Sequence, residues 1–190
     1  MTSGPPRWLL SGGIGSGKST VRKLLEKVGL RTIDADSVGH GVLQEEAIEE
    51  VSARWPGVVD DGTIDRSALA AIVFSDADAL RELESITHPL IFGRITADLD
   101  GYMAPAIVEV PLLESVLGWP RLVVDADDGL RSERLLARGE TEEDVARRIA
   151  AQPSRRQWLA SADAVIPNHG SREELEATVA KLAGHLVGDD

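Results

Sequence analysis

The sequence predicts an α/β fold built on a parallel, doubly wound sheet. Short apolar runs alternate along the chain with longer segments in which apolar residues recur every three or four positions. Such an alternation of strands and helices is typical of a parallel sheet with helices on both faces. Residues 37–103 interrupt it with helical patterns alone, which indicates a helical subdomain inserted between the second and third strands. At 190 residues, the chain is long enough for one domain that carries such an insertion.

The first strand, the turn after it and the first helix form the pattern that organises the chain. Residues 9–11 form the expected strand, and residues 12–19 fit the phosphate-binding motif G-x-x-x-x-G-K-[ST], the P-loop. Glycines let successive backbone N–H groups converge on phosphate oxygens, and a helix that begins near Gly17 adds a positive dipole end. We expect Lys18 to reach the β- and γ-phosphates and the Ser19 hydroxyl to bind Mg²⁺. The residues expected to bind nucleotide here are Gly13, Ile14, Gly15, Ser16, Gly17, Lys18, Ser19 and Thr20.

Two aspartates follow the second expected strand, residues 30–33. Asp34 and Asp36 come at its C-terminal end, where ligands bind in an open parallel sheet. A carboxylate in this place holds a Mg²⁺-bound water or accepts a proton from an attacking hydroxyl. It also suits the N-cap of the next helix. Beside a P-loop, the functional interpretation is favoured.

Helical patterns follow one another through the inserted block, and no strand is expected there. One pattern contains Leu69 and another Leu80, while a third is expected to open at Pro89, because proline suits the first turn of a helix. Residues 60–62 give a turn signal between them. For His88, just before the proline, local sequence favours a helix cap, since a single histidine indicates no site by itself.

The sheet is expected to resume after the insertion. Further strands are expected at residues 106–110, 121–125 and 164–166, and helices at residues 130–137, 141–151 and in the last segment. Thr141 begins an N-terminal capping pattern, and Ser171 forms a capping box with Glu174 at the start of the last helix.

A group of arginines supplies local positive charge in an acidic protein. Most of them are expected on solvated helix faces, paired with acids such as Glu140 and Asp144. The group consists of Arg121, Arg131, Arg134, Arg138, Arg147, Arg148, Arg155 and Arg156.

The composition of the chain limits the classes of function that it can have. The net charge of −12 opposes generic nucleic-acid binding. The lack of cysteine excludes disulfides and thiolate metal sites and suits a reducing cytoplasm. Neither a signal peptide nor an apolar run of membrane-spanning length is found, so no membrane partner is expected. We expect a cytoplasmic protein that is a monomer or a weak homo-oligomer.

In these motifs the chain resembles the dephospho-CoA kinases, P-loop kinases of the last step of coenzyme A synthesis. The resemblance covers about residues 9–186 in order. The P-loop matches theirs nearly letter for letter, and Asp34-Ala35-Asp36 matches their Asp-Ala-Asp motif. Other similar segments are Gly62-Thr63-Ile64-Asp65-Arg66, Val73-Phe74, residues 83–91, Pro111-Leu112-Leu113, residues 148–152, Ala162-Asp163, Asn168 and Gly170. A P-loop alone identifies no substrate, but this ordered series is specific.

The resemblance implies a P-loop kinase-like three-layer fold with a parallel five-stranded sheet, an inserted helical acceptor-binding subdomain and a helical lid. Its parts would be a core of residues 7–36, 104–129 and 160–190, a subdomain of about 37–103 and a lid of about 130–159. It also implies ATP-dependent, Mg²⁺-assisted phosphorylation of the 3′-hydroxyl of dephospho-CoA. Closure of the lid would exclude water from the transferred phosphoryl group.

The resemblance further implies roles for single residues. Asp36 would orient or deprotonate the acceptor hydroxyl, and Lys18 would stabilise charge on the transferred group. The residues outside the P-loop expected to bind ATP are Arg138, Arg148 and Asn168. Those expected to bind the acceptor are Asp36, His40, Arg66, His88, Pro111 and Leu112.

The chain departs from the family pattern in three places. His40 stands where the family usually has an arginine, and Trp158 stands where it often has a basic residue. Glu114 directly follows Pro-Leu-Leu, where the family usually has Phe-Glu. Without a charged, bidentate guanidinium at position 40, the affinity for the acceptor is affected more than the affinity for ATP, because the P-loop is intact.

Three alternatives stay open at this point. A kinase of the same build with another nucleotide-like acceptor would accommodate His40 and Trp158. A P-loop switch protein would accommodate D-x-x-G at residues 36–39, although this motif follows the P-loop too soon and no N-K-x-D guanine signature occurs. A catalytically silent relative would bind nucleotide or CoA without turnover.

Overall fold

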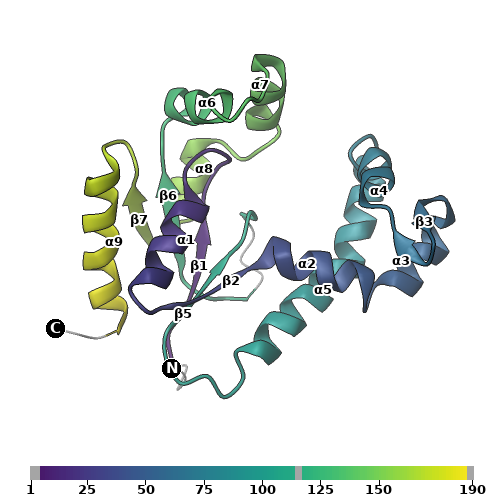
Figure 1. Ribbon diagram of the computed structural model, residues 1–190, viewed down its shortest axis with the longest axis horizontal. Helices are drawn as coiled ribbons and strands as arrows, with labels where there is room; N and C mark the ends of the chain where they lie inside the picture. Colours follow the sequence, from purple (N-terminus) through teal and green to yellow (C-terminus); the bar gives the residue numbers. More distant parts are fainter. Residues whose placement is uncertain (1–4, 114–116, 188–190) are drawn as a thin grey trace. The chain divides into compact units, whose positions relative to one another are not determined.

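The computed structural model describes residues 5–113 and 117–187 (Figure 1). The chain divides into two compact units. The first comprises Met1–Ile33 and Gly101–Asp190, and the second comprises Asp34–Asp100. In the described part of the chain, no helix is both long and apolar enough to cross a membrane.

A five-stranded sheet forms the centre of the first unit, in the order β2-β5-β1-β6-β7. The central strand β1 pairs in parallel with β5 and with β6, and β6 pairs in parallel with β7. The strands are β1 (Arg7–Ser11), β2 (Arg31–Asp34), β5 (Ala106–Glu109), β6 (Arg121–Asp125) and β7 (Ala164–Pro167). The parallel five-stranded sheet expected from the sequence is confirmed.

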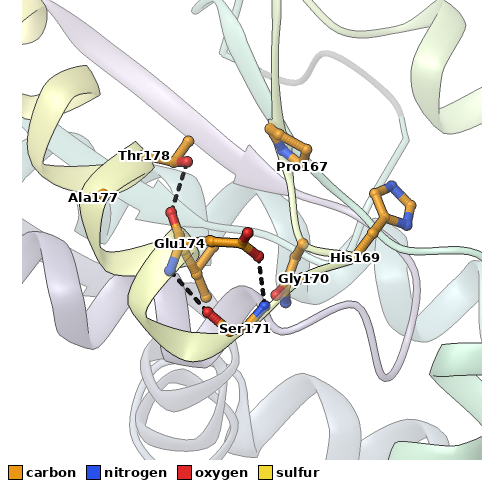
Figure 2. Close-up of a pocket in the computed structure, with 9 residues that line it drawn as sticks. Pro167, His169, Gly170, Ser171, Glu174, Ala177 and Thr178 are labelled. Atoms are coloured by element: carbon orange, nitrogen blue, oxygen red, sulfur yellow. Dashed lines mark hydrogen bonds between the residues drawn. The ribbon is translucent and has the colours of Figure 1, made fainter.

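The helices of this unit follow from local signals as well as from packing. They are α1 (Lys18–Lys27), α6 (Asp128–Leu136), α7 (Glu142–Ala150), α8 (Arg155–Ala160) and α9 (Arg172–Val187). Thr141 caps α7 by accepting a hydrogen bond from the Asp144 N–H. Ser171 and Glu174 exchange hydrogen bonds at the start of α9, which confirms the expected capping box (Figure 2).

The main core lies between the sheet and the pair of helices α1 and α9, which contact each other. Leu25 and Val21 of α1, Val179 of α9 and Ile107 and Leu122 of the sheet all contribute to it, each essentially without solvent exposure. This packing fixes the direction in which α1 leaves the sheet, and with it the loop that joins β1 to α1.

The second unit is helical, apart from a small hairpin. Its elements are α2 (Ala35–Gln44), α3 (Ile48–Arg54), a 3₁₀ helix (Pro56–Val58), β3 (Val59–Asp60), β4 (Thr63–Ile64), α4 (Arg66–Val73) and α5 (Ala77–Asp98). The antiparallel hairpin of β3 and β4 was not expected, because two-residue strands are too short to show alternation. The turn predicted at residues 60–62 connects them, with positive φ at Asp61 and Gly62.

Helix α5 corrects the sequence analysis. It continues through Pro89, which was expected to open a separate helix, and it begins after its N-cap Asp76. His88 is therefore inside a helix and is not a cap. Leu83 and Ile86 before the proline and Leu90 after it all pack on the same buried cluster of the second unit. Tertiary packing on both sides of Pro89 therefore outweighs its local preference to begin a helix.

We predict that Pro89→Ala stabilises the protein. In a regular α-helix, the missing N–H of Pro89 would donate to the Ser85 carbonyl, so alanine restores a hydrogen bond and removes a steric clash. The free energy of unfolding should rise by about 1–3 kcal/mol. Pro56→Ala is the matched control and should not give this gain, because Pro56 opens the 3₁₀ helix and its missing N–H costs no helical hydrogen bond. Thermal and urea unfolding of both variants check this, and a less stable Pro89→Ala protein would contradict it.

Candidate active site

The glycine-rich loop of residues 12–17 joins the end of β1 to the start of α1. Gly17 is the N-cap of α1, with a φ of 100°. A side chain there would be strained by the backbone conformation, and its Cβ would lie 2.3 Å from Nδ2 of Asn168. Glycine is therefore required for the loop to pass Asn168 and enter the helix. The loop leads into the N-terminus of α1, where the first backbone N–H groups of a helix and the positive end of its dipole favour an anion.

Lys18 extends back over the loop that precedes it. Its ammonium donates to the carbonyl oxygens of Gly12 at 2.9 Å and Gly13 at 3.3 Å. The positive charge therefore lies at the concave backbone that the sequence identified as a phosphate site. The structure thus brings the expected lysine to the expected loop.

Ser19 lies beside a carboxylate that the sequence analysis did not select. Its hydroxyl donates to Oε1 of Glu109 at 3.1 Å, and Arg22 donates through Nε to the other carboxylate oxygen at 2.8 Å. Glu109 is only 8% exposed and ends β5, opposite Leu10 of β1. An acid that ends an apolar strand was a usable signal, since the same rule selected Asp34 and Asp36.

Hydroxyl and carboxylate oxygens are the ligands that Mg²⁺ takes, so Ser19 and Glu109 fit this ion chemically. In the described residues, no group of three or more His, Cys, Asp or Glu side chains is placed to hold a metal ion. An ion at Ser19 and Glu109 would thus take most of its ligands from phosphate and water, which is the usual arrangement for Mg²⁺.

Asn168 and Arg134 hold the other side of the loop. Asn168, which is buried, donates through Nδ2 to the Ser16 carbonyl at 2.7 Å, and Arg134 donates to the Asn168 carbonyl at 2.9 Å. The Ser16 hydroxyl is buried, and the described part of the protein offers it no hydrogen-bond partner. A small cavity of about 190 Å³ opens here. It is lined by Gly17, Thr20, Arg134, Arg138, Asn168, Gly170, Arg172 and Leu175.

A second cavity, of about 410 Å³, is lined by the segment after β7 and by the first turns of α9 (Figure 2). Asn168, Gly170 and Leu175 line both cavities. Asn168 and Gly170 therefore form a shared wall next to the loop. The sequence-predicted residues Thr20, Arg138 and Asn168 meet around the smaller cavity, whereas Arg148 of α7 donates to Glu140 at 2.6 Å.

Asp125 anchors α8 to the end of β6. Its two carboxylate oxygens accept from Nε and Nη2 of Arg155 at 2.8 and 2.7 Å, and His169 lies 3.0 Å away. The bidentate bond from Arg155 holds the pKa of Asp125 below its ordinary value, although burial opposes this shift. A buried carboxylate with a guanidinium partner of this geometry is a strong local tie.

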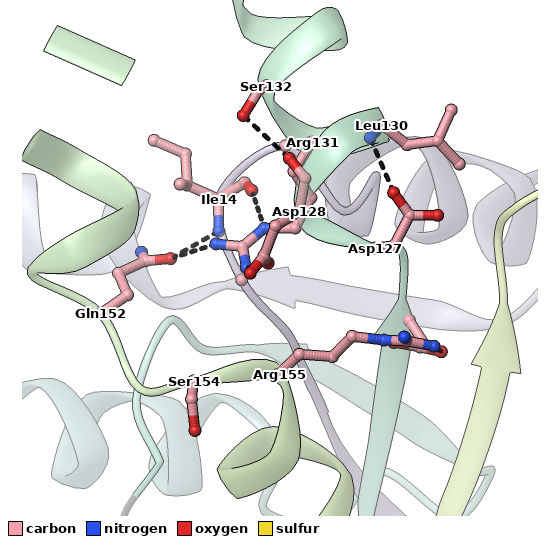
Figure 3. A network of polar contacts seen from close by, with 12 residues as sticks. Ile14, Asp127, Asp128, Leu130, Arg131, Ser132, Gln152, Ser154 and Arg155 are labelled. Carbon is pink, nitrogen blue, oxygen red and sulfur yellow. Dashed lines mark hydrogen bonds and ion pairs between the residues drawn. The ribbon is translucent and has the colours of Figure 1, made fainter. Parts of the chain in front are cut away.

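Several arginines are not solvated as the sequence analysis expected. Arg131 is 2% exposed and donates to the Ile14 carbonyl at 2.8 Å (Figure 3). Arg121 is 3% exposed and bonds the Ser11 hydroxyl and the Leu112 carbonyl. Arg134 and Arg155 also contact backbone or buried acid rather than surface acids. Loop carbonyls that lack helical partners attract guanidinium groups, and sequence patterning does not show where those carbonyls are.

The expected pairing of solvated arginines with surface acids is found on α7. Arg147 pairs with Asp144, and Arg148 pairs with Glu140, in exposed ion pairs. Two further expectations concern segments outside the helices. Pro111 and Leu112 follow β5 after Val110, while Glu114 lies outside the described residues.

The remaining departure, Trp158, belongs to the interior of the first unit. It is 2% exposed and lies in α8, which contacts β6. A tryptophan in this place fills buried space rather than offering a charge to a ligand.

The second unit carries the other predicted residues. Asp34 caps α2, accepting from the N–H groups of Asp36 and Ser37 at 3.1 and 3.2 Å. Asp36 is exposed in the first turn of the same helix. His88 packs edge-to-face on Phe92 within α5.

His40 and Arg66 are brought together, with Nε2 of the imidazole 2.6 Å from Nη2 of the guanidinium. A guanidinium only donates, so Nε2 of His40 accepts and its ring proton resides on Nδ1. The positive charge of the pair therefore belongs to Arg66.

Comparison with known proteins points in one direction. A family model described as dephospho-CoA kinase matches residues 9–174. The dephospho-CoA kinase of Deinococcus radiodurans is 41% identical over 90% of this chain and 88% of its own length. The crystal structure of TT1252 from Thermus thermophilus has a TM-score of 0.85 at 34% identity, covering 97% of this chain and 99% of its own. The dephospho-CoA kinase structure from Campylobacter jejuni has a TM-score of 0.74 at 25% identity, covering 96% and 98%.

We predict that Asp125→Asn lowers the free energy of unfolding by about 1–3 kcal/mol at neutral pH, because it removes a charge from a buried bidentate bond. The folded-state pKa of Asp125 is lowered, so this stabilisation is present above the unfolded pKa and is lost as the pH falls through the folded pKa. The difference between wild type and variant should therefore persist at about pH 5 and shrink toward about pH 3. Asp144→Asn, at an exposed pair, should cost much less than Asp125→Asn. Urea unfolding across this pH range checks both, and a difference that grows in acid would contradict the assignment.

Proposed function

The chain belongs to the dephospho-CoA kinase family, and from this premise we propose how its residues carry out the ATP-dependent phosphorylation of dephospho-CoA to CoA. The observation that carries the proposal is the loop of residues 12–19 with Lys18 folded over it and Ser19 against Glu109. Such a site is suited to bind the phosphates of ATP and to transfer the γ-phosphoryl group to the 3′-hydroxyl of dephospho-CoA.

The loop and Lys18 bind the β- and γ-phosphates in this proposal. Bound phosphate oxygens compete with the Gly12 and Gly13 carbonyls for the ammonium of Lys18. The phosphate is the stronger partner, because it carries a full negative charge and a carbonyl does not. Lys18 then stabilises charge that builds up on the transferred group. Since the loop is already formed, little reorganisation is needed during the reaction.

We propose that Ser19 and Glu109 hold Mg²⁺, Ser19 directly and Glu109 either directly or through water. The ion, when bound, neutralises charge on the β- and γ-phosphates. Arg22 fixes the Glu109 carboxylate from the other side at 2.8 Å, so that one oxygen stays directed at Ser19. Arg22 is therefore a positioning residue for this pair.

We place the nucleoside part of ATP at residues 168–170, where Asn168 and Arg138 line the small cavity next to Gly17. Arg138 is exposed, and its charge is available at the cavity. Arg148 remains a proposed lid contact, for which it would have to leave Glu140. We also propose that the enzyme acts in the cytoplasm, which its lack of cysteine suits.

The second unit binds dephospho-CoA in this proposal, and Asp36 accepts the proton of the 3′-hydroxyl. Asp34 holds the first turn of α2 and thereby the backbone that carries Asp36. The pair of His40 and Arg66 supplies one full positive charge for a phosphate of the acceptor, with the histidine orienting the guanidinium. His88 would line the acceptor side from α5.

We predict that the protein releases ADP from ATP only when dephospho-CoA is present, and that Lys18→Ala abolishes most of this turnover. The lost charge-assisted contact is worth about 2–4 kcal/mol, or roughly 30- to 1000-fold in rate. Lys23→Ala is the matched control, an exposed lysine on the same helix, and should leave the rate unchanged. A coupled ADP-release assay over a panel of acceptors measures this. Turnover with another acceptor but not with dephospho-CoA would overturn the substrate assignment.

The two aspartates of the Asp-Ala-Asp motif should differ in their effect. Asp36→Asn should lower kcat by about 10²–10⁴-fold while ATP affinity is kept, because an amide does not accept the proton. Asp34→Asn should cost far less, since asparagine is also a good N-cap. Measured kcat and ATP dissociation constants for both variants decide the assignment. An inactive Asp34→Asn beside a nearly normal Asp36→Asn would place the base on the other carboxylate.

A further inference from the structure

The peptide unit between Gly13 and Ile14 is held on two opposite sides. Its carbonyl, Gly13 O, accepts from Nζ of Lys18 at 3.3 Å and from the Ser16 N–H at 3.1 Å. Its N–H, at Ile14, donates to Oε1 of Gln152 at 2.7 Å. Since the peptide is planar and trans, these two groups point in opposite directions. The Ile14 N–H therefore faces away from Lys18, toward the outside of the loop.

Arg131 extends the same contact along the backbone (Figure 3). Its Nε donates to the Ile14 carbonyl at 2.8 Å, and its Nη2 lies 3.3 Å from Oε1 of Gln152. Asp128 accepts from Nη1 at 2.7 Å and orients the guanidinium. Both peptide groups that flank Ile14 are thus bound by side chains from outside the loop.

Gly13 leaves the space that this arrangement needs. A Cβ built on Gly13 would lie 2.5 Å from Cζ of Arg131. The missing side chain of Gly13 thus makes room for Arg131 on the outside of the loop. In a phosphate site, by contrast, glycines are needed so that the inside of the loop can approach phosphate.

We infer that Gln152 is a positioning residue for phosphoryl transfer: it fixes the outside of the P-loop so that the inside keeps its shape for ATP. The inference rests on the proposed function, in which this loop binds the phosphates. Without Gln152, the peptide between Gly13 and Ile14 is free to rotate, because the neighbouring glycines impose few backbone limits. Rotation would break the contact between Gly13 O and Lys18, and a preorganised site would become a flexible one.

Gln152 follows α7 and precedes α8, so the same bond joins the segment between these helices to the loop. Its oxygen accepts from both the Ile14 N–H and Arg131, which makes the carbonyl oxygen the essential atom of the side chain. A substitution that keeps an acceptor at this place should therefore keep the function.

The test compares Gln152→Ala with Gln152→Glu. Gln152→Ala should lower kcat/KM for ATP by about 10- to 100-fold, the size expected from a misplaced reacting group, and should weaken binding of ATP and ADP together. The KM for dephospho-CoA at saturating ATP should stay unchanged. Gln152→Glu keeps the acceptor oxygen beside Arg131 and should recover most of the activity.

Gln157→Ala is the matched control, because the Gln157 side chain completes the capping box of α8 in the same segment but does not contact the loop. Thermal unfolding of each variant shows whether the fold is kept. A fully active Gln152→Ala, an equal loss in Gln157→Ala, or a Gln152→Glu variant worse than Gln152→Ala would each overturn the inference. If the wild type showed no turnover, the proposed function would fail, but direct ATP and ADP dissociation constants would still test Gln152.

Discussion

The active site depends on a constraint that is specific to a glycine-rich backbone: a loop with few side chains of its own has to be held in shape by its neighbours. The loop of residues 12–17 has such supports on several sides. Lys18 binds its carbonyls from within, Asn168 binds the Ser16 carbonyl from the end of β7, and Gln152 binds the Ile14 N–H from the outside. These supports come from segments far apart in the sequence, which the parallel sheet brings to one edge. The fold therefore holds a glycine-rich loop in one defined shape.

The sequence predicted those parts of the structure that local chemistry determines. The order of strand, glycine-rich loop and helix in residues 7–27, the parallel strands and the capping box at Ser171 are all specified by a few neighbouring residues, and each is confirmed. Helix α5 was predicted wrongly, because the decision at Pro89 depends on packing from both sides. The buried arginines were also missed, since their partners are carbonyl oxygens that become available only where the chain turns. Glu109 could have been predicted from the sequence, because an acid at the end of an apolar strand is visible there.

Charge in this protein is organised locally rather than overall. The chain carries a net charge of −12, yet the loop that is proposed to bind triphosphate is surrounded by Lys18, Arg131 and Arg134. Asp128 pairs with Arg131 in the same region. In the second unit, His40 leaves the positive charge of its pair on Arg66. Positive charge can therefore be concentrated at one loop of a chain whose net charge is negative.

The ion pair between Asp125 and Arg155 has a topological consequence. It joins positions 30 residues apart, and these flank the segment that contains α6 and α7. The segment is thereby a closed ring, fastened to the sheet by the covalent chain at one end and by a bidentate salt bridge at the other. Arg131 and Gln152, which lie inside the ring, also contact the loop of residues 12–17, so the ring is held at these points as well as at its two ends. The entropy cost of ordering it is correspondingly smaller than for an open-ended segment of the same length, because closure has already removed much of its freedom.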